Sequence, residues 1–158
     1  MSDRVFVDTN IFVYAKLITA KEQEKNQMAK HFLQTQPENV VVSTQVLSEF
    51  ASVLIKHRVS DNNIQLAVEA IAESSLVSAV SWHTVQAALR IKFRYQFSYR
   101  DSLIIASALE NNCTVLFTED LQHDQLIEEK LISDMSLQEQ LEFLWKHPRA
   151  MLVRQVES

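Results

Sequence analysis

The 158-residue chain contains no glycine, a single cysteine and two prolines. At average usage, a chain of this length would hold roughly eleven glycines. Their absence excludes glycine-rich phosphate loops, dinucleotide-binding fingerprints and nucleophile elbows flanked by glycine. The lone cysteine, Cys113, excludes an internal disulfide and a zinc site built from cysteines. The chemistry of this protein must therefore rest on other kinds of side chain.

Positive charge and long apolar runs are also scarce. Lysine and arginine total 15 against 20 aspartates and glutamates, which gives a net charge of −5. A nucleic-acid binder that relies on its overall charge is basic, so any such binding here needs a local basic patch or metal ions. No run approaches the ~18 apolar residues of a membrane span, and the first residues do not form a signal peptide. We expect a cytoplasmic protein without membrane contact.

Short apolar runs alternate with segments of helical periodicity. Continuous apolar runs are typical of strands buried on both faces, and strands separated by helices indicate a parallel sheet covered by helices. We therefore predict one α/β domain with a short parallel sheet of about four to five strands. The predicted strands are 5–7, 40–42, 76–80 and 114–117, with 131–132 as a short edge strand; the predicted helices are 11–17, 21–34, 44–57, 61–73, 82–95, 99–110 and 136–145. The tail at 150–153 is left open between a strand and a loose end.

Acidic residues collect at the sheet edge where ligands bind in parallel α/β folds. Asp8 follows the first predicted strand, Asp120 follows the fourth, and Asp101 lies at the start of an apolar helix. Glu49 lies at the edge of the apolar stripe of its helix, where an acid is half-buried and needs a partner. Neighbouring carboxylates repel one another unless a cation lies among them. Because Mg²⁺ and Mn²⁺ prefer oxygen ligands, the joint placement favours a metal site.

Each acid also has a structural interpretation. Asp8 is a candidate N-cap for the helix that follows it. Asp101 lies three residues after Ser98 in the pattern of a capping box, and Asp120 taken alone is a loop residue. Considered one at a time these structural roles are favoured, whereas considered together the acids favour a metal site.

A block of basic and aromatic residues leads into Asp101. Residues 90–100 hold four basic and four aromatic side chains, and such groups hold phosphates and stack on unpaired bases. The same block fits an ordinary helix end, where the helix dipole favours cations. Arg94 and Arg100 therefore stay open between substrate binding and a structural role. His123 is a further candidate for substrate contact, with a solvated loop histidine as the simpler interpretation.

Four segments, in this order and spacing, resemble the PIN domain, most closely the VapC-type toxins of bacterial toxin–antitoxin pairs. They are VFVDTNIFVY at 5–14, STQVLSEF at 43–50, RYQFSYRDSLIIASA at 94–108 and LFTEDLQH at 116–123. The resemblance implies a three-layer α/β domain and a Mg²⁺- or Mn²⁺-dependent endoribonuclease. It implies that the catalytic and metal-binding acids are Asp8, Glu49, Asp101 and Asp120.

The resemblance carries further expectations about the site and its partners. Thr118 matches a hydroxyl residue that helps order water or metal, and Asn10 matches a polar residue near the site. The implied substrate is RNA, including structured RNA such as tRNA. The implied protein partners are a second copy in a homodimer and a small antitoxin, which often places an arginine among the acids.

The chain departs from the family pattern in two places. Asp124 stands where the family usually has glycine, just after His123. The resemblance ends near Ile132, so we expect a PIN-like nuclease domain at 1–132 and an extension at 133–158. We expect that extension, a helix and a tail of open role, to pack on the same domain.

Other functions compete with this interpretation. A PIN-like module without catalysis would bind RNA or protein, and a PIN nuclease need not be a toxin. A receiver domain needs a lysine beyond its last strand, and none occurs before Lys130. A phosphatase with Asp8 as nucleophile would need an acid where Asn10 stands. The expected metal binding separates the nuclease from the inactive module.

Overall fold

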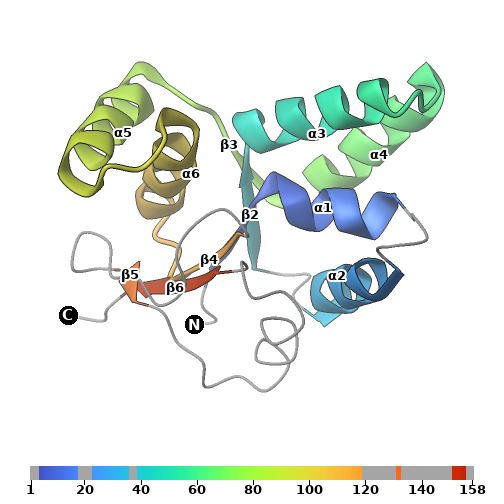
Figure 1. The fold of residues 1–158 in the computed structure, drawn as a ribbon, viewed down its shortest axis with the longest axis horizontal. Helices are drawn as coiled ribbons and strands as arrows, with labels where there is room; N and C mark the ends of the chain where they lie inside the picture. Colours follow the sequence, from blue (N-terminus) through green and yellow to red (C-terminus); the bar gives the residue numbers. More distant parts are fainter. Residues whose placement is uncertain (1–3, 18–22, 36–38, 119–130, 133–150, 156–158) are drawn as a thin grey trace.

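The computed structural model describes residues 4–17, 23–35, 39–118, 131–132 and 151–155. Within these ranges, strands and helices alternate along most of the chain, as Figure 1 shows. The strands are β1 (Val5–Val7), β2 (Val40–Ser43), β3 (Leu76–Ser78), β4 (Val115–Thr118), β5 (Leu131–Ile132) and β6 (Met151–Gln155). The helices are α1 (Thr9–Lys16), α2 (Gln23–Thr35), α3 (Thr44–Lys56), α4 (Asp61–Ser74), α5 (Trp82–Tyr95) and α6 (Tyr99–Glu110).

The strands form one sheet in the order β3-β2-β1-β4-β6-β5. Strands β1 to β4 are parallel, which confirms the predicted parallel sheet. Strand β6 pairs antiparallel with β4, and β5 pairs antiparallel with β6. The tail therefore forms a strand and lies beside β4, so that the expected edge strand 131–132 is one place further out. The helix expected at 136–145 lies outside the described residues.

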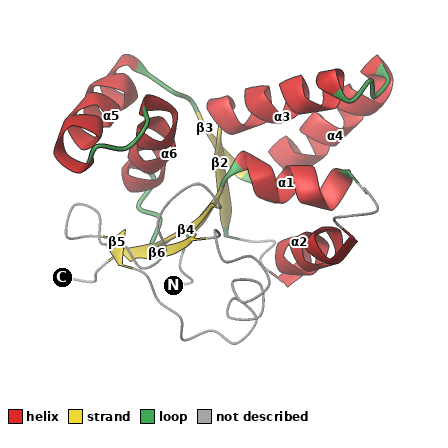
Figure 2. Ribbon diagram, viewed as in Figure 1, coloured by secondary structure: helices red, strands yellow, loops and turns green. Residues whose placement is uncertain are grey.

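Helices cover the sheet on both sides, which is the three-layer arrangement expected of the fold. Figure 2 shows α5 and α6 together on one side of the strands and α1 to α4 on the other. The central strands are buried along their whole described length, with Phe6 and Phe117 fully buried. Strand β3 differs, since Leu76 is 46% exposed and Val77 is 39% exposed. The expectation of burial on both faces is wrong for β3 because it is an edge strand.

Side-chain caps begin most of the described helices. The serines Ser43, Ser60, Ser81 and Ser98 each accept a hydrogen bond from the backbone N–H three residues later, and Asp8 caps α1. The cap predicted at Ser98 is confirmed. Such caps satisfy backbone donors that have no partner inside the helix. Two of these caps, Asp8 and Ser98, lie beside residues of the candidate site.

Several helix ends use a left-handed residue without using glycine. Arg58, Gln96 and Asn112 have φ angles of 58°, 62° and 54°, and they follow α3, α5 and α6. Glycine is the usual residue at such positions because it has no Cβ to clash. A residue with a Cβ pays roughly 1–2 kcal/mol for this conformation. The lack of glycine is thus tolerated at these turns at a modest cost in stability.

No helix in the described ranges is long and apolar enough to cross a membrane.

The thiol of Cys113 is expected to be unreactive in the native protein. The residue is fully buried beside β4, and burial raises the pKa of the thiol to about 12, although the charge of Arg4 lowers it. Only the thiolate attacks a thiol reagent, so very little of the reactive form exists at neutral pH. A colorimetric thiol assay should show no reaction over minutes in buffer and one equivalent in denaturant. Rapid reaction of the native protein would contradict the buried position.

Candidate active site

An open pocket of about 700 Å³ lies at the carboxyl edge of the parallel strands, between the beginnings of α1 and α6 and one face of α3. This is the position that the topology of parallel sheets predicts for a ligand. Polar side chains make up most of its lining, which consists of Thr9, Asn10, Ser48, Glu49, Ser52, Val53, Ser98, Arg100 and Asp101.

Asp8 lies beneath this pocket and is completely buried. It follows β1 directly and caps α1, since its Oδ1 accepts from the backbone N–H of Thr9 at 2.6 Å. Its other oxygen, Oδ2, accepts from the hydroxyl of Thr118, the last residue of β4, at 2.7 Å. The structural and functional interpretations of Asp8 therefore do not exclude each other. A buried carboxylate of this kind requires both hydrogen bonds and a positive charge.

Glu49 comes to the same place from α3. Its side chain is 30% exposed, as expected for an acid at the edge of an apolar stripe, and Val46 and Phe50 are buried beside it. The hydroxyl of Thr9 donates to its Oε2 at 2.9 Å, and the amide of Gln45 donates to its Oε1 at 3.1 Å. These two contacts hold both carboxylate oxygens in a defined direction.

Asp101 reaches the pocket from the first turn of α6. The hydroxyl of Ser98 accepts from its backbone N–H at 3.1 Å, which confirms the predicted cap. Its carboxylate Oδ1 accepts from the guanidinium of Arg100 at 3.0 Å. The cap therefore positions the backbone of Asp101, while its side chain takes part in the acidic cluster.

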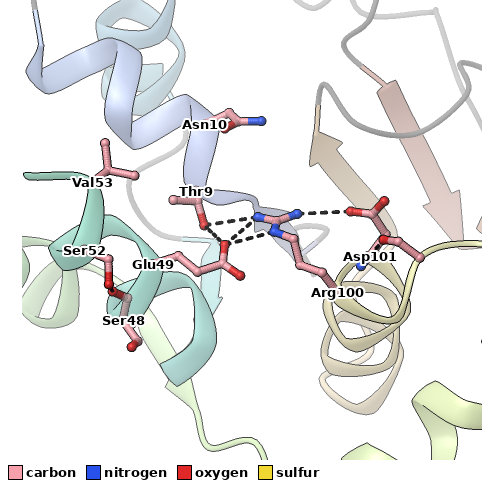
Figure 3. Close-up of a pocket in the computed structure, with 9 residues that line it drawn as sticks. Thr9, Asn10, Ser48, Glu49, Ser52, Val53, Arg100 and Asp101 are labelled. Atoms are coloured by element: carbon pink, nitrogen blue, oxygen red, sulfur yellow. Dashed lines mark hydrogen bonds and ion pairs between the residues drawn. The ribbon is translucent and has the colours of Figure 1, made fainter. Parts of the chain in front are cut away.

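Arg100 lies at the centre of the three acids, as Figure 3 shows for Glu49 and Asp101. One terminal nitrogen lies 2.8 Å from Asp8 and 2.6 Å from Glu49, and the other lies 3.0 Å from Asp101. Burial alone lowers the pKa of Arg100, but the hydrogen bonds and charges of Asp8 and Glu49 raise it above its usual value. The guanidinium is therefore a permanent positive charge among carboxylates that sequence analysis placed around a metal.

The donor groups suit a hard divalent cation, although their present spacing suits the guanidinium. Carboxylate and hydroxyl oxygens are the ligands that Mg²⁺ and Mn²⁺ prefer. Three carboxylates against one guanidinium leave two negative charges, which one divalent ion would neutralise. Within the described ranges, however, no three acidic, histidine or cysteine side chains are arranged so as to hold a metal ion. The residues fit the ion by chemistry, and the acids must close in around it.

The structure places the remaining predicted site residues in different positions relative to the pocket. Asn10 lines the pocket. The hydroxyl of Thr118 donates to Asp8, and its expected part in ordering water or metal stays a prediction. Arg94 is exposed on α5, with its guanidinium carbon 5.4 Å from the ring centre of Tyr95, and is not among the residues that line the pocket. The predictions for Asp120, His123 and Asp124 fall outside the described residues.

The roles of Thr9 and Gln45 were not predicted from the sequence. Both lie within segments that resemble the family, and both hold Glu49 by hydrogen bonds. Gln45 lies four residues before Glu49 on the same helix, a spacing that brings two side chains together. That spacing was the available signal for Gln45, whereas the contact of Thr9 with Glu49 depends on how α1 packs against α3.

Most of the chain matches a known family. The family model of the PIN domain matches residues 5–129. A search of curated protein sequences finds no match.

Solved structures with a similar fold include toxins of toxin–antitoxin systems. VapC20 of Mycobacterium tuberculosis, a sarcin–ricin loop cleaving toxin, has a TM-score of 0.59 and 20% identity over 71% of this chain and 86% of its own. A toxin–antitoxin complex from Klebsiella pneumoniae has a TM-score of 0.58 and 17% identity, over 73% of this chain and 85% of its own. VapBC2 from Rickettsia felis, bound to a DNA fragment from its promoter, has a TM-score of 0.55 and 19% identity, over 73% of this chain and 86% of its own. Because the family model covers most of the sequence, and the fold agrees, this chain belongs to the PIN domain family.

Proposed function

We propose that this chain is a metal-dependent endoribonuclease that acts as the toxin of a toxin–antitoxin pair. The observation that carries the proposal is the meeting of Asp8, Glu49 and Asp101, from three separate elements, around one cation. Carboxylates that crowd together are costly to a fold. In a PIN domain, such a cluster of oxygen ligands suits a divalent cation that faces a phosphate.

The proposed cofactor is Mg²⁺ or Mn²⁺, held by Asp8, Glu49 and Asp101 with Asp120 as the fourth acid. When bound, such a cation lowers the pKa of water at the site and offsets charge on the phosphate. Thr118 orients Asp8, and Gln45 orients Glu49. Water attacks the phosphorus in line with the leaving 3′ oxygen, which leaves a 5′ phosphate and a 3′ hydroxyl.

RNA is the proposed substrate class, including structured RNA such as tRNA. The similar Mycobacterium tuberculosis protein is a sarcin–ricin loop cleaving toxin, and the Klebsiella pneumoniae structure is a toxin–antitoxin complex. The second of these structures supports a small antitoxin as partner. A homodimer and a cytoplasmic location are part of the proposal through the family resemblance and the sequence. Arg94 and His123 are the proposed contacts for the RNA backbone, because cationic side chains neutralise phosphates.

One observation favours a second function, that of an inactive PIN-like binding module. Arg100 already neutralises part of the acidic cluster, so the acids have a structural use without metal. A module of this kind would bind neither Mg²⁺ nor Mn²⁺ and would cleave no RNA. A calorimetric titration with Mn²⁺ distinguishes the two functions before any substrate is known.

Purified protein is expected to cut mixed cellular RNA into discrete fragments when Mn²⁺ or Mg²⁺ is present and to cut nothing in chelator. The metal requirement follows because negatively charged carboxylates cannot offset the charge of a phosphate, whereas a divalent cation offsets that charge and lowers the pKa of bound water. Gel electrophoresis with end mapping of the fragments measures both the cleavage and the target.

The matched control is Asp101→Asn, which removes one charge and keeps the size of the side chain. Its lanes should resemble the chelator lanes. Cleavage that persists in chelator would overturn the metal dependence. Mn²⁺ binding without any cleavage would contradict general RNA cleavage, and absence of both would favour the binding module.

A further inference from the structure

We propose that Arg100 is a built-in competitor for the metal site, so that a divalent cation must displace its guanidinium from Asp8 before the nuclease can act. This inference rests on the proposed function, because it assigns a regulatory contact to the same acidic cluster. It predicts that the protein restrains its own activity, in addition to any antitoxin.

The guanidinium of Arg100 occupies the oxygen atoms that a metal ion would need. Arg100 contacts both oxygens of Asp8, at 2.8 and 3.3 Å, and it reaches Oε2 of Glu49 with two of its nitrogens, at 2.6 and 3.1 Å. The remaining lone pairs of Asp8 are directed at the backbone of Thr9 and the hydroxyl of Thr118. A cation that binds Asp8 therefore competes for the oxygen atoms that Arg100 already holds.

Arg100 also lies nearer to solvent than Asp8 does. Asp8 is fully buried and does not line the pocket, whereas Arg100 is about a third exposed, at 34%, and does line it. The guanidinium thus lies between solvent and the most deeply buried acid. An ion that enters through the pocket meets Arg100, Glu49 and Asp101 before it reaches Asp8.

The side chain of Arg100 can move away from the acids without unfolding the helix that carries it. Its backbone belongs to the first turn of α6, where Ser98 provides the cap and Gln45 donates to the carbonyl of Arg100 at 3.3 Å. The side chain is long, and its outer side faces the pocket. Rotation about its side-chain bonds would move the charge toward solvent and leave the backbone of Asp101 in place.

Electrostatics supports competition rather than joint binding. The guanidinium and a divalent cation at Asp8 would lie within a few ångströms of each other, where like charges repel strongly in a partly buried site. Without the ion, Arg100 compensates Asp8, which would otherwise be a buried charge without a counter-ion. The guanidinium and the metal ion therefore occupy the acidic cluster in turn. Each one reduces the apparent affinity of the cluster for the other.

The test compares Mn²⁺ binding in wild-type protein, Arg100→Gln and Arg90→Gln by calorimetry. Arg90→Gln is the matched control, because it removes the same charge from an exposed position on α5. Arg100→Gln is expected to bind Mn²⁺ at least about tenfold more tightly than wild type, while Arg90→Gln stays within about twofold. Without metal, Arg100→Gln should also melt at a lower temperature and should gain more than wild type when Mn²⁺ is added.

Equal or weaker Mn²⁺ binding by Arg100→Gln overturns the inference and marks Arg100 as a purely structural partner of the acids. If Arg100→Gln does not fold, the wild-type protein decides the question through the NMR signal of the Arg100 side-chain N–H, which now donates to Glu49. Saturating Mg²⁺ should shift this signal, and an unchanged signal counts against displacement. Tighter Mn²⁺ binding by Arg100→Gln together with no cleavage of mixed RNA would support the inference and contradict general RNA cleavage, so the two failures are distinguishable.

Discussion

Replacing Asp8 with asparagine is expected to reduce metal-dependent RNA cleavage by about 100- to 1,000-fold while the protein still folds. A loss of this size corresponds to several kcal/mol of stabilisation of the transition state, which is what a metal-holding charge supplies. Asparagine has the same shape, and its carbonyl oxygen still accepts a hydrogen bond from Thr9 or Thr118. Initial rates of cleavage in Mn²⁺, together with a thermal melting curve, measure both effects.

The presence of Arg100 sets the sign of the stability change in this variant. In a bare acidic cluster, removal of one charge would relieve repulsion and stabilise the protein. Here Arg100 loses a buried partner at 2.8 Å, so Asp8→Asn should destabilise the metal-free protein by about 1–3 kcal/mol. The control is Asp61→Asn, the same chemical change at an exposed position on α4, which should leave the cleavage rate unaltered. A cleavage rate within tenfold of wild type would remove Asp8 from the proposed site.

Truncation of Phe50 to alanine is expected to lower the free energy of unfolding by about 3–5 kcal/mol, the usual cost of deleting a buried phenylalanine ring. Phe50 is 2% exposed, lies next to Glu49 on α3, and meets Phe12 of α1 edge to face with ring centres 6.2 Å apart. The ring thus joins the helix that carries Glu49 to the helix that begins after Asp8. Urea denaturation monitored by circular dichroism gives the free energy, and the melting temperature should fall by roughly 10 °C.

Ile55→Ala on the same helix is the matched control for this truncation. Ile55 is 62% exposed, so its removal should change the free energy of unfolding by less than about 0.5 kcal/mol. Similar losses in the two variants would mean that α3 is not anchored through Phe50. A third variant, Phe50→Leu, keeps most of the apolar volume and should fall between the two.

Local patterns were sufficient to predict most of the secondary structure. The continuous apolar runs at 5–7 and 40–42 are buried strands of a parallel sheet, and the serine cap at Ser98 begins α6 where expected. These features depend on neighbouring residues along the chain, so they can be predicted without knowledge of the tertiary structure. The position of β6 in the sheet could not be predicted, because a short apolar tail carries no information about which distant strand it will pair with.

The composition of the acidic site was predictable, while its arrangement was not. Asp8, Glu49 and Asp101 could be assigned to one edge of the sheet because parallel strands end on the same side. Gln45 was accessible through its four-residue spacing from Glu49. The contact of Thr9 with Glu49 and that of Thr118 with Asp8 join residues 40 and 110 positions apart. Contacts of this length are decided by the packing of whole elements.

The sequence by itself determined the class of this protein: an α/β chain whose carboxylates follow its strands, with the motifs of the PIN domain in order. Only the tertiary structure decided what those carboxylates contact. Arg100 had been open between an RNA contact and a helix end, yet it points inward and joins Asp8, Glu49 and Asp101. The physical reason is that a long, flexible charged side chain turns toward the strongest electrostatic attraction within its reach. Three carboxylates create that field only after α1, α3 and α6 have packed together.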